Sequence, residues 1–157
     1  MSDWTIRAAT ADDESGLSFH WLKSFAHSAY GRARNADADR TDAEAAYWAA
    51  HEPIVFGLLR RCDVSLVVDP AAPHVFWAML CAEPGRIHYL LSKRVWHNAD
   101  RDDGTREVAS MFKALLGPRY EAPHAMSHEL PEMRRAGLPV PTAWHYDPYA
   151  VYERASK

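Results

Sequence analysis

Hydrophobic residues recur at two different spacings in the first third of the chain, and the change of spacing separates the predicted elements. Residues 4–8 alternate between polar and apolar positions, as in a strand, whereas residues 13–28 and 43–61 repeat apolar positions at helical spacing. Pro53 lies inside the second helical pattern. Because proline removes a backbone donor and clashes with the preceding turn, we expect the helix to kink or restart there.

Three strands are predicted in the middle of the chain. Residues 64–68 alternate, and residues 74–82 are apolar at nearly every position, which is typical of a central strand covered on both faces. Residues 87–91 follow after a Pro-Gly turn. We expect these strands to form an antiparallel meander, with the strand at 87–91 in the interior of the sheet.

The remaining segments complete an α/β pattern. Residues 104–117 predict a helix that stops at Gly117-Pro118, and residues 124–129 predict a short strand. A short helix at 131–136 and a turn-rich last strand within 141–152 follow. We therefore expect one α/β domain over residues 1–157, with a mixed, twisted sheet of about six or seven strands and helices on both faces.

Composition excludes several classes of protein. The 157 residues, 48% of them apolar, can bury a core without a metal or disulfide frame. Eighteen Lys and Arg against 21 Asp and Glu give a net charge of −3, so the charge does not indicate a nucleic-acid partner. No membrane segment or secretory signal is predicted, so we expect a cytoplasmic protein. Its two cysteines, Cys62 and Cys81, are then expected to be reduced and buried.

Several short motifs, taken with the order of the elements, resemble the GNAT acyltransferase superfamily. They are residues 6–12 (IRAATAD), 21–25 (WLKSF), Tyr47-Trp48 with His51, 87–93 (IHYLLSK) and 147–149 (DPY). Together they resemble the small GNAT-like proteins carried by phages and prophages, over roughly residues 4–152. The resemblance implies transfer of an acyl group from coenzyme A to an amine, and acetyl is the acyl group expected. That amine is a small metabolite, a protein or a modified nucleobase, and the sequence does not choose among them.

The resemblance also implies where coenzyme A binds. In the family, backbone groups of the fourth strand hold the pantetheine arm, and amides opening the next helix bind the pyrophosphate. The matching positions are Leu90, Leu91, Ser92, Lys93, Arg101, Gly104, Thr105 and Arg106. Two neighbours, Asp102 and Asp103, depart from the family's pattern because carboxylates repel a diphosphate, and Arg106 replaces a small residue.

Acylation of an amine needs a group that takes the ammonium proton. Glu83 stands directly after the strand at 74–82, and His88 lies in the next strand. An imidazole is the type of side chain that commonly serves as a base near neutral pH. Each also has a plain structural interpretation, as a solvated carboxylate and as a partly buried histidine bonded across the sheet. In the family a tyrosine acts as the general acid, but residues 130–137 contain no tyrosine. Tyr149 is named as a substitute only because it lies near this segment in the sequence.

Other interpretations stay open beside the enzyme. A GNAT-like domain that has lost its cofactor and acts as a binding or inhibitory protein would also explain Asp102 and Asp103. The basic and aromatic run at 93–97 is of a type that contacts nucleotides or nucleic acid, and equally of a type found in surface loops. No metal site is predicted, because His124 and His128 on an extended segment would lie ~13 Å apart.

Overall fold

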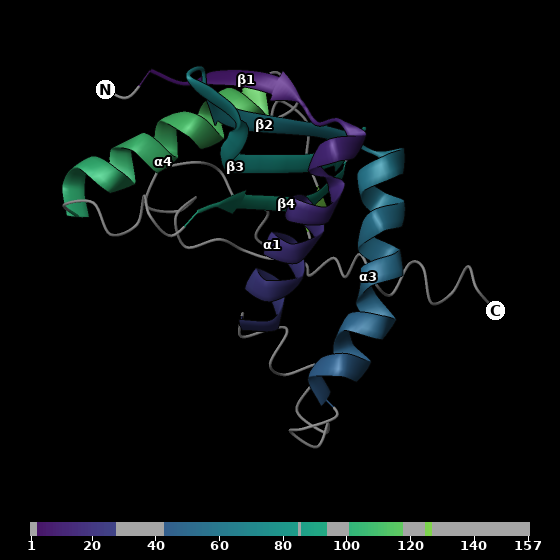
Figure 1. The fold of residues 1–157 in the computed structure, drawn as a ribbon. Coiled ribbons are helices and arrows are strands. Elements are labelled where there is room, and N and C mark those ends of the chain that lie inside the picture. The colour runs from purple at the N-terminus through teal and green to yellow at the C-terminus, as the bar shows by residue number, and fades with distance from the viewer. Residues whose placement is uncertain (1–2, 28–42, 85, 94–100, 118–124, 127–157) are drawn as a thin grey trace. The chain divides into compact units, whose positions relative to one another are not determined.

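A computed structural model describes residues 3–27, 43–84, 86–93, 101–117 and 125–126, which form two compact units (Figure 1). The first unit contains β1 (Thr5–Ala8), β2 (Asp63–Asp69), β3 (Ala72–Glu83), β4 (Arg86–Ser92), α4 (Arg101–Leu116) and β5 (Ala125–Met126). The second unit contains the 3-10 turn η1 (Ala11–Asp13), α1 (Glu14–His27) and α3 (Ala43–Arg61). The expectation of a single domain over residues 1–157 stays a prediction.

The strands of the first unit form one mixed sheet in the order β1-β2-β3-β4-β5. The first four are antiparallel neighbours, and β5 runs parallel to β4. The predicted α/β class and the antiparallel meander are therefore confirmed. Within the described residues β4 lies between β3 and β5, although β5 pairs only with Arg86 and Ile87. The short helix and last strand expected after residue 130 fall outside the described residues.

Two helices differ in detail from their predicted form. The α3 helix has the predicted bounds and is continuous through Pro53, so of the two expected outcomes, a kink or a restart, the restart was wrong. Proline has no backbone N–H, so the carbonyl one turn before Pro53 lacks its helical hydrogen bond. Because Pro53 is exposed, water can donate to that carbonyl instead. The α4 helix begins at Arg101, three residues before the expected start at 104.

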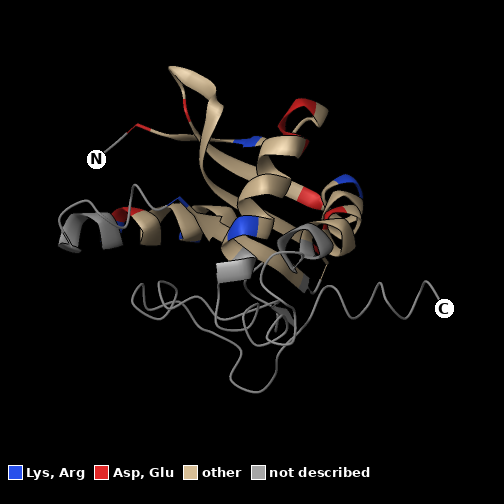
Figure 2. Ribbon diagram, turned by 60° about the horizontal axis from the view of Figure 1, so that its bottom comes forward, with Lys and Arg blue, Asp and Glu red and all other residues tan. Residues whose placement is uncertain are grey.

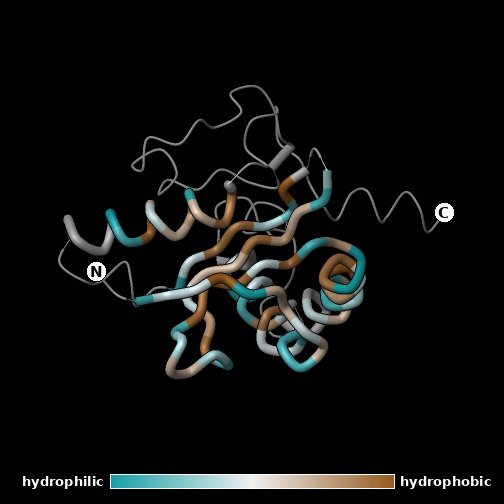
Figure 3. The backbone as a smooth tube through the Cα atoms, turned by 90° about the horizontal axis from the view of Figure 1, so that it is seen from above, coloured by the Kyte–Doolittle hydropathy of each residue, from teal (hydrophilic) through white to brown (hydrophobic). Residues whose placement is uncertain are grey.

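One face of the sheet is covered by α4, and the two together enclose a hydrophobic core. In β2, β3 and β4 the Asp, Glu and Arg residues occur only at the first or last position of a strand (Figure 2), and hydrophobic residues predominate in the middle of β2 and in the second half of β3 (Figure 3). At the edge of this core the Trp4 indole donates a 2.8 Å hydrogen bond to Glu107 of α4. The core residues are Val67, Ala78, Leu80, Ala82, Ile87, Leu90, Val108, Met111, Phe112, Leu115 and Leu116.

A β-bulge interrupts the pairing of β3 with β4. Ala82 pairs with Ile87, but the preceding Cys81 pairs with Tyr89, so His88 is an extra residue on β4. Because side chains alternate along a regular strand, Ile87 and Leu90 could not otherwise share a face. The bulge places both in the core beneath α4.

The second unit pairs two helices in opposite directions. Arg60, near the end of α3, donates from Nε to both carboxylate oxygens of Glu14 at the start of α1, at 3.2 and 3.0 Å. This hydrogen bonding raises the pKa of the exposed Arg60 guanidinium, with a smaller contribution from the charge of Glu14. A capping box opens η1, in which the Asp13 carboxylate accepts hydrogen bonds from the Thr10 amide and hydroxyl at 2.8 and 3.1 Å.

Among the described residues, none of the helices combines the length and hydrophobicity needed to span a membrane.

Candidate functional site

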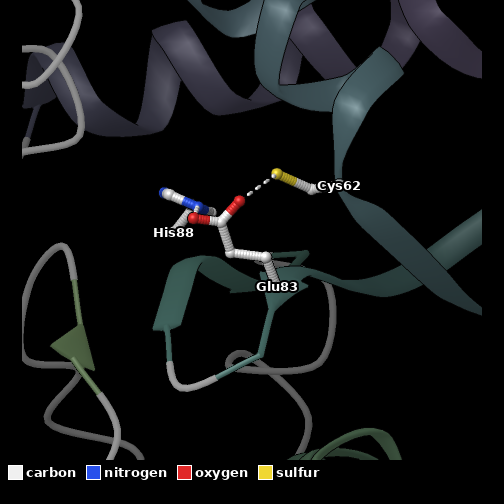
Figure 4. Close-up of side chains that lie close together, drawn as sticks. All are labelled: Cys62, Glu83 and His88. Carbon is white, nitrogen blue, oxygen red and sulfur yellow. Dashed lines mark hydrogen bonds and ion pairs between the residues drawn. The ribbon is translucent and has the colours of Figure 1, made fainter.

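Three side chains with chemically active donor atoms meet at one end of the sheet (Figure 4). Cys62 immediately precedes β2, Glu83 is the last residue of β3, and His88 is the extra residue of the β4 bulge. Their thiol sulfur, carboxylate oxygen and imidazole nitrogen all lie within 4.8 Å of one another. All three residues belong to the first unit.

The Glu83 carboxylate lies at the centre of this cluster. Its Oε1 is 3.5 Å from His88 Nε2, and its Oε2 accepts a 3.8 Å contact from the Cys62 thiol. The His88 side chain is completely buried, whereas that of Glu83 is 27% exposed. One carboxylate therefore contacts a buried imidazole and is also open to solvent.

Strand register explains why these residues meet. Glu83 at the end of β3 pairs with Arg86 at the start of β4, and Asp63 of β2 pairs with Ala82. Cys62 therefore lies across from Glu83, one residue beyond the last pair of β2 with β3. Because Ala82 belongs to the core under α4 and side chains alternate, Glu83 projects from the other face of the sheet.

The order of the contacts limits the chemistry. A nucleophilic cysteine is activated by a base that contacts its thiol, usually an imidazole oriented by a third group. In this cluster the carboxylate lies between the thiol and the imidazole, so the order is Cys62, Glu83, His88. That order does not favour nucleophilic attack by the Cys62 sulfur. It favours proton transfer at Glu83, or joint binding of one ligand by the three donor atoms.

Two predicted catalytic residues are thus brought together, and a third participant was missed. The sequence indicated Glu83 and His88 as separate candidates and Cys62 only as a buried thiol. The structure shows that Cys62 is partly exposed, so the prediction of burial was wrong for this residue. The sequence carried no usable signal for Cys62, because its place across from Glu83 depends on the register of β2 against β3, which shifts on both sides of Val68. The predicted Tyr149 lies outside the described residues.

The strand residues expected to hold the pantetheine arm are mostly enclosed. Leu90 and Ser92 are buried and Leu91 is partly buried. Lys93 follows β4 directly, and its amide donates a 2.8 Å hydrogen bond to the Trp77 carbonyl. The Lys93 ammonium lies 4.1 Å from the centre of the Phe76 ring, within the range of a cation–π contact.

The residues expected to bind pyrophosphate lie in the first turns of α4. Arg101 is its first residue, Gly104 and Thr105 follow in the helix, and Arg106 is exposed. The side chains of Arg101 and Thr105 fall outside what the structure describes. The first four amides of a helix lack partners within it, so the amides available to an anion start at Arg101, not at Gly104. Binding of coenzyme A at this helix stays a prediction.

Burial lowers the pKa of the Lys93 amine below its ordinary value. The unfolded chain then holds this proton more tightly, so the fold gains stability as the pH rises from the lowered pKa toward the ordinary one. We expect an NMR titration of the lysine side chains to show this lowered pKa, with the signal assigned by its loss in Lys93→Arg. The same titration in denaturant should return the pKa to its ordinary value. A raised pKa in the folded protein would show that attraction to the Phe76 ring outweighs burial.

Comparison with known proteins assigns no family to this arrangement. No protein-family model, curated protein or solved structure matches the chain significantly.

Proposed function

We propose that the protein is an N-acyltransferase that moves an acyl group, most simply acetyl, from coenzyme A to an amine. In this proposal Glu83 is the general base. The observation that carries the proposal is the partly exposed Glu83 side chain, whose Oε1 lies 3.5 Å from Nε2 of the buried His88. A base must reach the substrate from solvent and must be held in one orientation while it does so. Glu83 is partly exposed, and its place at the end of β3 is set by pairing with Arg86 and by the contacts with His88 and Cys62.

The topology of the first unit supports the same proposal. The meander β2-β3-β4 is followed by α4 and then by a strand parallel to β4. This is the order that the resemblance to GNAT acyltransferases implies for the strand and helix flanking a coenzyme A thioester. Among the described residues β5 pairs only with the start of β4, at Arg86 and Ile87. That pairing is compatible with a pantetheine arm approaching the later residues of β4, which the resemblance assigns to the cofactor.

The proposed reaction has one proton transfer at the protein. Glu83 takes a proton from the substrate ammonium, and the neutral amine attacks the thioester carbonyl carbon. The new bond is N–C, the bond that breaks is C–S, and the electron pair leaves on the coenzyme A sulfur. The second proton leaves the nitrogen as the tetrahedral intermediate collapses and reaches the sulfur through solvent, while Glu83 returns the first proton to bulk water. His88 acts as a positioning residue, because its buried ring contacts Glu83 and not the bulk solvent.

Thermal unfolding with and without coenzyme A tests the first requirement of the proposal. A ligand at 100 times its dissociation constant stabilises a fold by ~2.7 kcal/mol, which a melting curve detects. We expect stabilisation by coenzyme A and acetyl-CoA, and no comparable effect of adenosine alone. With acetyl-CoA and a panel of amines, mass spectrometry should detect an acetylated amine.

Absence of stabilisation at millimolar coenzyme A would favour the alternative class, a GNAT-like domain that binds or inhibits a partner without catalysis. One structural observation favours this alternative. Because α4 begins at Arg101, Asp102 and Asp103 occupy its first turn, where the unpaired amides would otherwise attract an anion. Their negative charges oppose a diphosphate there.

A further inference from the structure

We propose that Cys62, Glu83 and His88 form a binding site for one divalent transition-metal ion, with Zn²⁺ as the ion that fits best. The ion would take the Cys62 sulfur, a Glu83 carboxylate oxygen and the His88 Nε2 as ligands. Three protein ligands leave a fourth position open, as in zinc sites that keep a solvent molecule or a substrate.

The spacing of the donor atoms is the main observation behind this proposal. Zinc bonds of about 2.0–2.1 Å to nitrogen and oxygen and about 2.3 Å to sulfur place tetrahedral ligands about 3.3 Å apart for N and O, and about 3.5 Å for S and O. The corresponding contacts here are 3.5 Å between His88 Nε2 and Glu83 Oε1, and 3.8 Å between Cys62 Sγ and Glu83 Oε2. These two contacts involve different oxygens of Glu83, and the three donor atoms lie within 4.8 Å of one another. Coordination of one ion through a single Glu83 oxygen therefore requires the side chains to rotate and draw together by up to about 1 Å.

The chemistry of the donors selects the class of ion. Thiolate and imidazole are ligands of Zn²⁺ and its neighbours, whereas Mg²⁺ and Ca²⁺ take oxygen ligands. On binding, the Cys62 thiol loses its proton to solvent, and the resulting thiolate and the Glu83 carboxylate together balance the two charges of the ion. Oxidation states do not change.

The surroundings favour one fixed geometry. His88 is completely buried, and the β4 bulge fixes its position on the strand. Glu83 and Cys62 are partly exposed, so an ion can enter from the side of these two residues. All three donors lie on the ends of strands or directly beside them, where the backbone is held by the sheet.

Metal binding is independent of acyl transfer, although the two share Glu83 and His88. A bound ion would occupy the lone pair that the proposed base uses. If the protein is an acyltransferase, Zn²⁺ is therefore expected to inhibit it. Binding itself is measured without coenzyme A, so a failure of the acyltransferase proposal and a failure of this one are separate results.

Titration of the untagged protein with Co²⁺ tests the site. A cobalt ion bound to thiolate shows an intense ligand-to-metal absorption band in the near ultraviolet, which nitrogen and oxygen ligands alone do not produce. We expect this band in the unmodified protein, its loss in Cys62→Ala, and its retention in the matched control Cys81→Ala. Glu83→Gln and His88→Gln should each weaken Zn²⁺ binding by more than the ~10–100-fold that loss of a supporting contact costs, and Mg²⁺ should not compete.

A second measurement needs no substitution. The unmodified protein is alkylated with and without Zn²⁺, and the two cysteines are followed separately by mass spectrometry. We expect Zn²⁺ to slow modification of the partly exposed Cys62, while the fully buried Cys81 serves as an internal reference. An unchanged rate at Cys62, or a cobalt band that survives in Cys62→Ala, would overturn the proposal.

Discussion

Replacing Phe112 by alanine is expected to lower the free energy of unfolding by about 3–5 kcal/mol, which is the range for deleting a buried aromatic side chain. Phe112 is 1% exposed and lies on α4 within the core that joins this helix to the sheet. Because this core comes from strands and helix of the same unit, a cavity there weakens the contact that holds α4 in place. Urea denaturation followed by circular dichroism measures the loss.

Phe19→Ala provides the matched control for this prediction. Phe19 is 47% exposed on α1, and its ring stacks on Trp48 with the ring centres 5.9 Å apart. An aromatic pair contributes about 0.5–1.5 kcal/mol beyond burial, so the control should lose far less stability than Phe112→Ala. Equal losses for the two variants would show that burial under α4 does not dominate the stability of the fold.

The hydrophobic pattern was sufficient to predict the elements whose burial is simple. Residues 78–82 of β3 are all buried, which explains why this segment reads as a continuous apolar run and is correctly predicted as a central strand. The helix predicted at 43–61 has those bounds in the structure because its apolar stripe continues on both sides of Pro53. In both cases the pattern reports the same burial that stabilises the element.

The bulge in β4 could not be predicted in this way. All residues from Ile87 to Leu91 are apolar or aromatic except His88, so the segment has no alternation that would reveal a shift of register. The shift depends on β3, where Ala82 and Leu80 must both face α4. The position of the bulge therefore depends on how β4 pairs with β3 and not on the sequence of β4 alone.

The candidate site was half predictable for the same reason. Glu83 and His88 flank one short hairpin, so their proximity follows from local sequence. Cys62 is 21 residues away from Glu83 and joins them only through the register of β2 against β3. A site whose residues come from different strands can be predicted only when the register of those strands is known.

Glu83→Gln is expected to lower kcat for amine acetylation by about 10²–10⁴-fold, which is the usual contribution of a general base. The amide keeps the size of the side chain and an oxygen that can still accept from Cys62, but it cannot take a proton from the substrate. Because the resemblance assigns the cofactor to β4 and α4, the KM for acetyl-CoA should change little. Steady-state kinetics measure both constants, with a chelator present so that no ion occupies Glu83.

The control is Glu52→Gln, which makes the same chemical change at an exposed position on α3. It should leave kcat and KM unchanged, which separates loss of the base from loss of one negative charge anywhere on the surface. His88→Asn should lower kcat by less than Glu83→Gln does, because His88 positions the carboxylate and does not itself take the proton. If Glu83→Gln keeps full kcat in an active protein, the proton goes elsewhere and Glu83 is not the base. A fall in kcat that is matched by an equal rise in the KM for acetyl-CoA would instead place Glu83 against the cofactor.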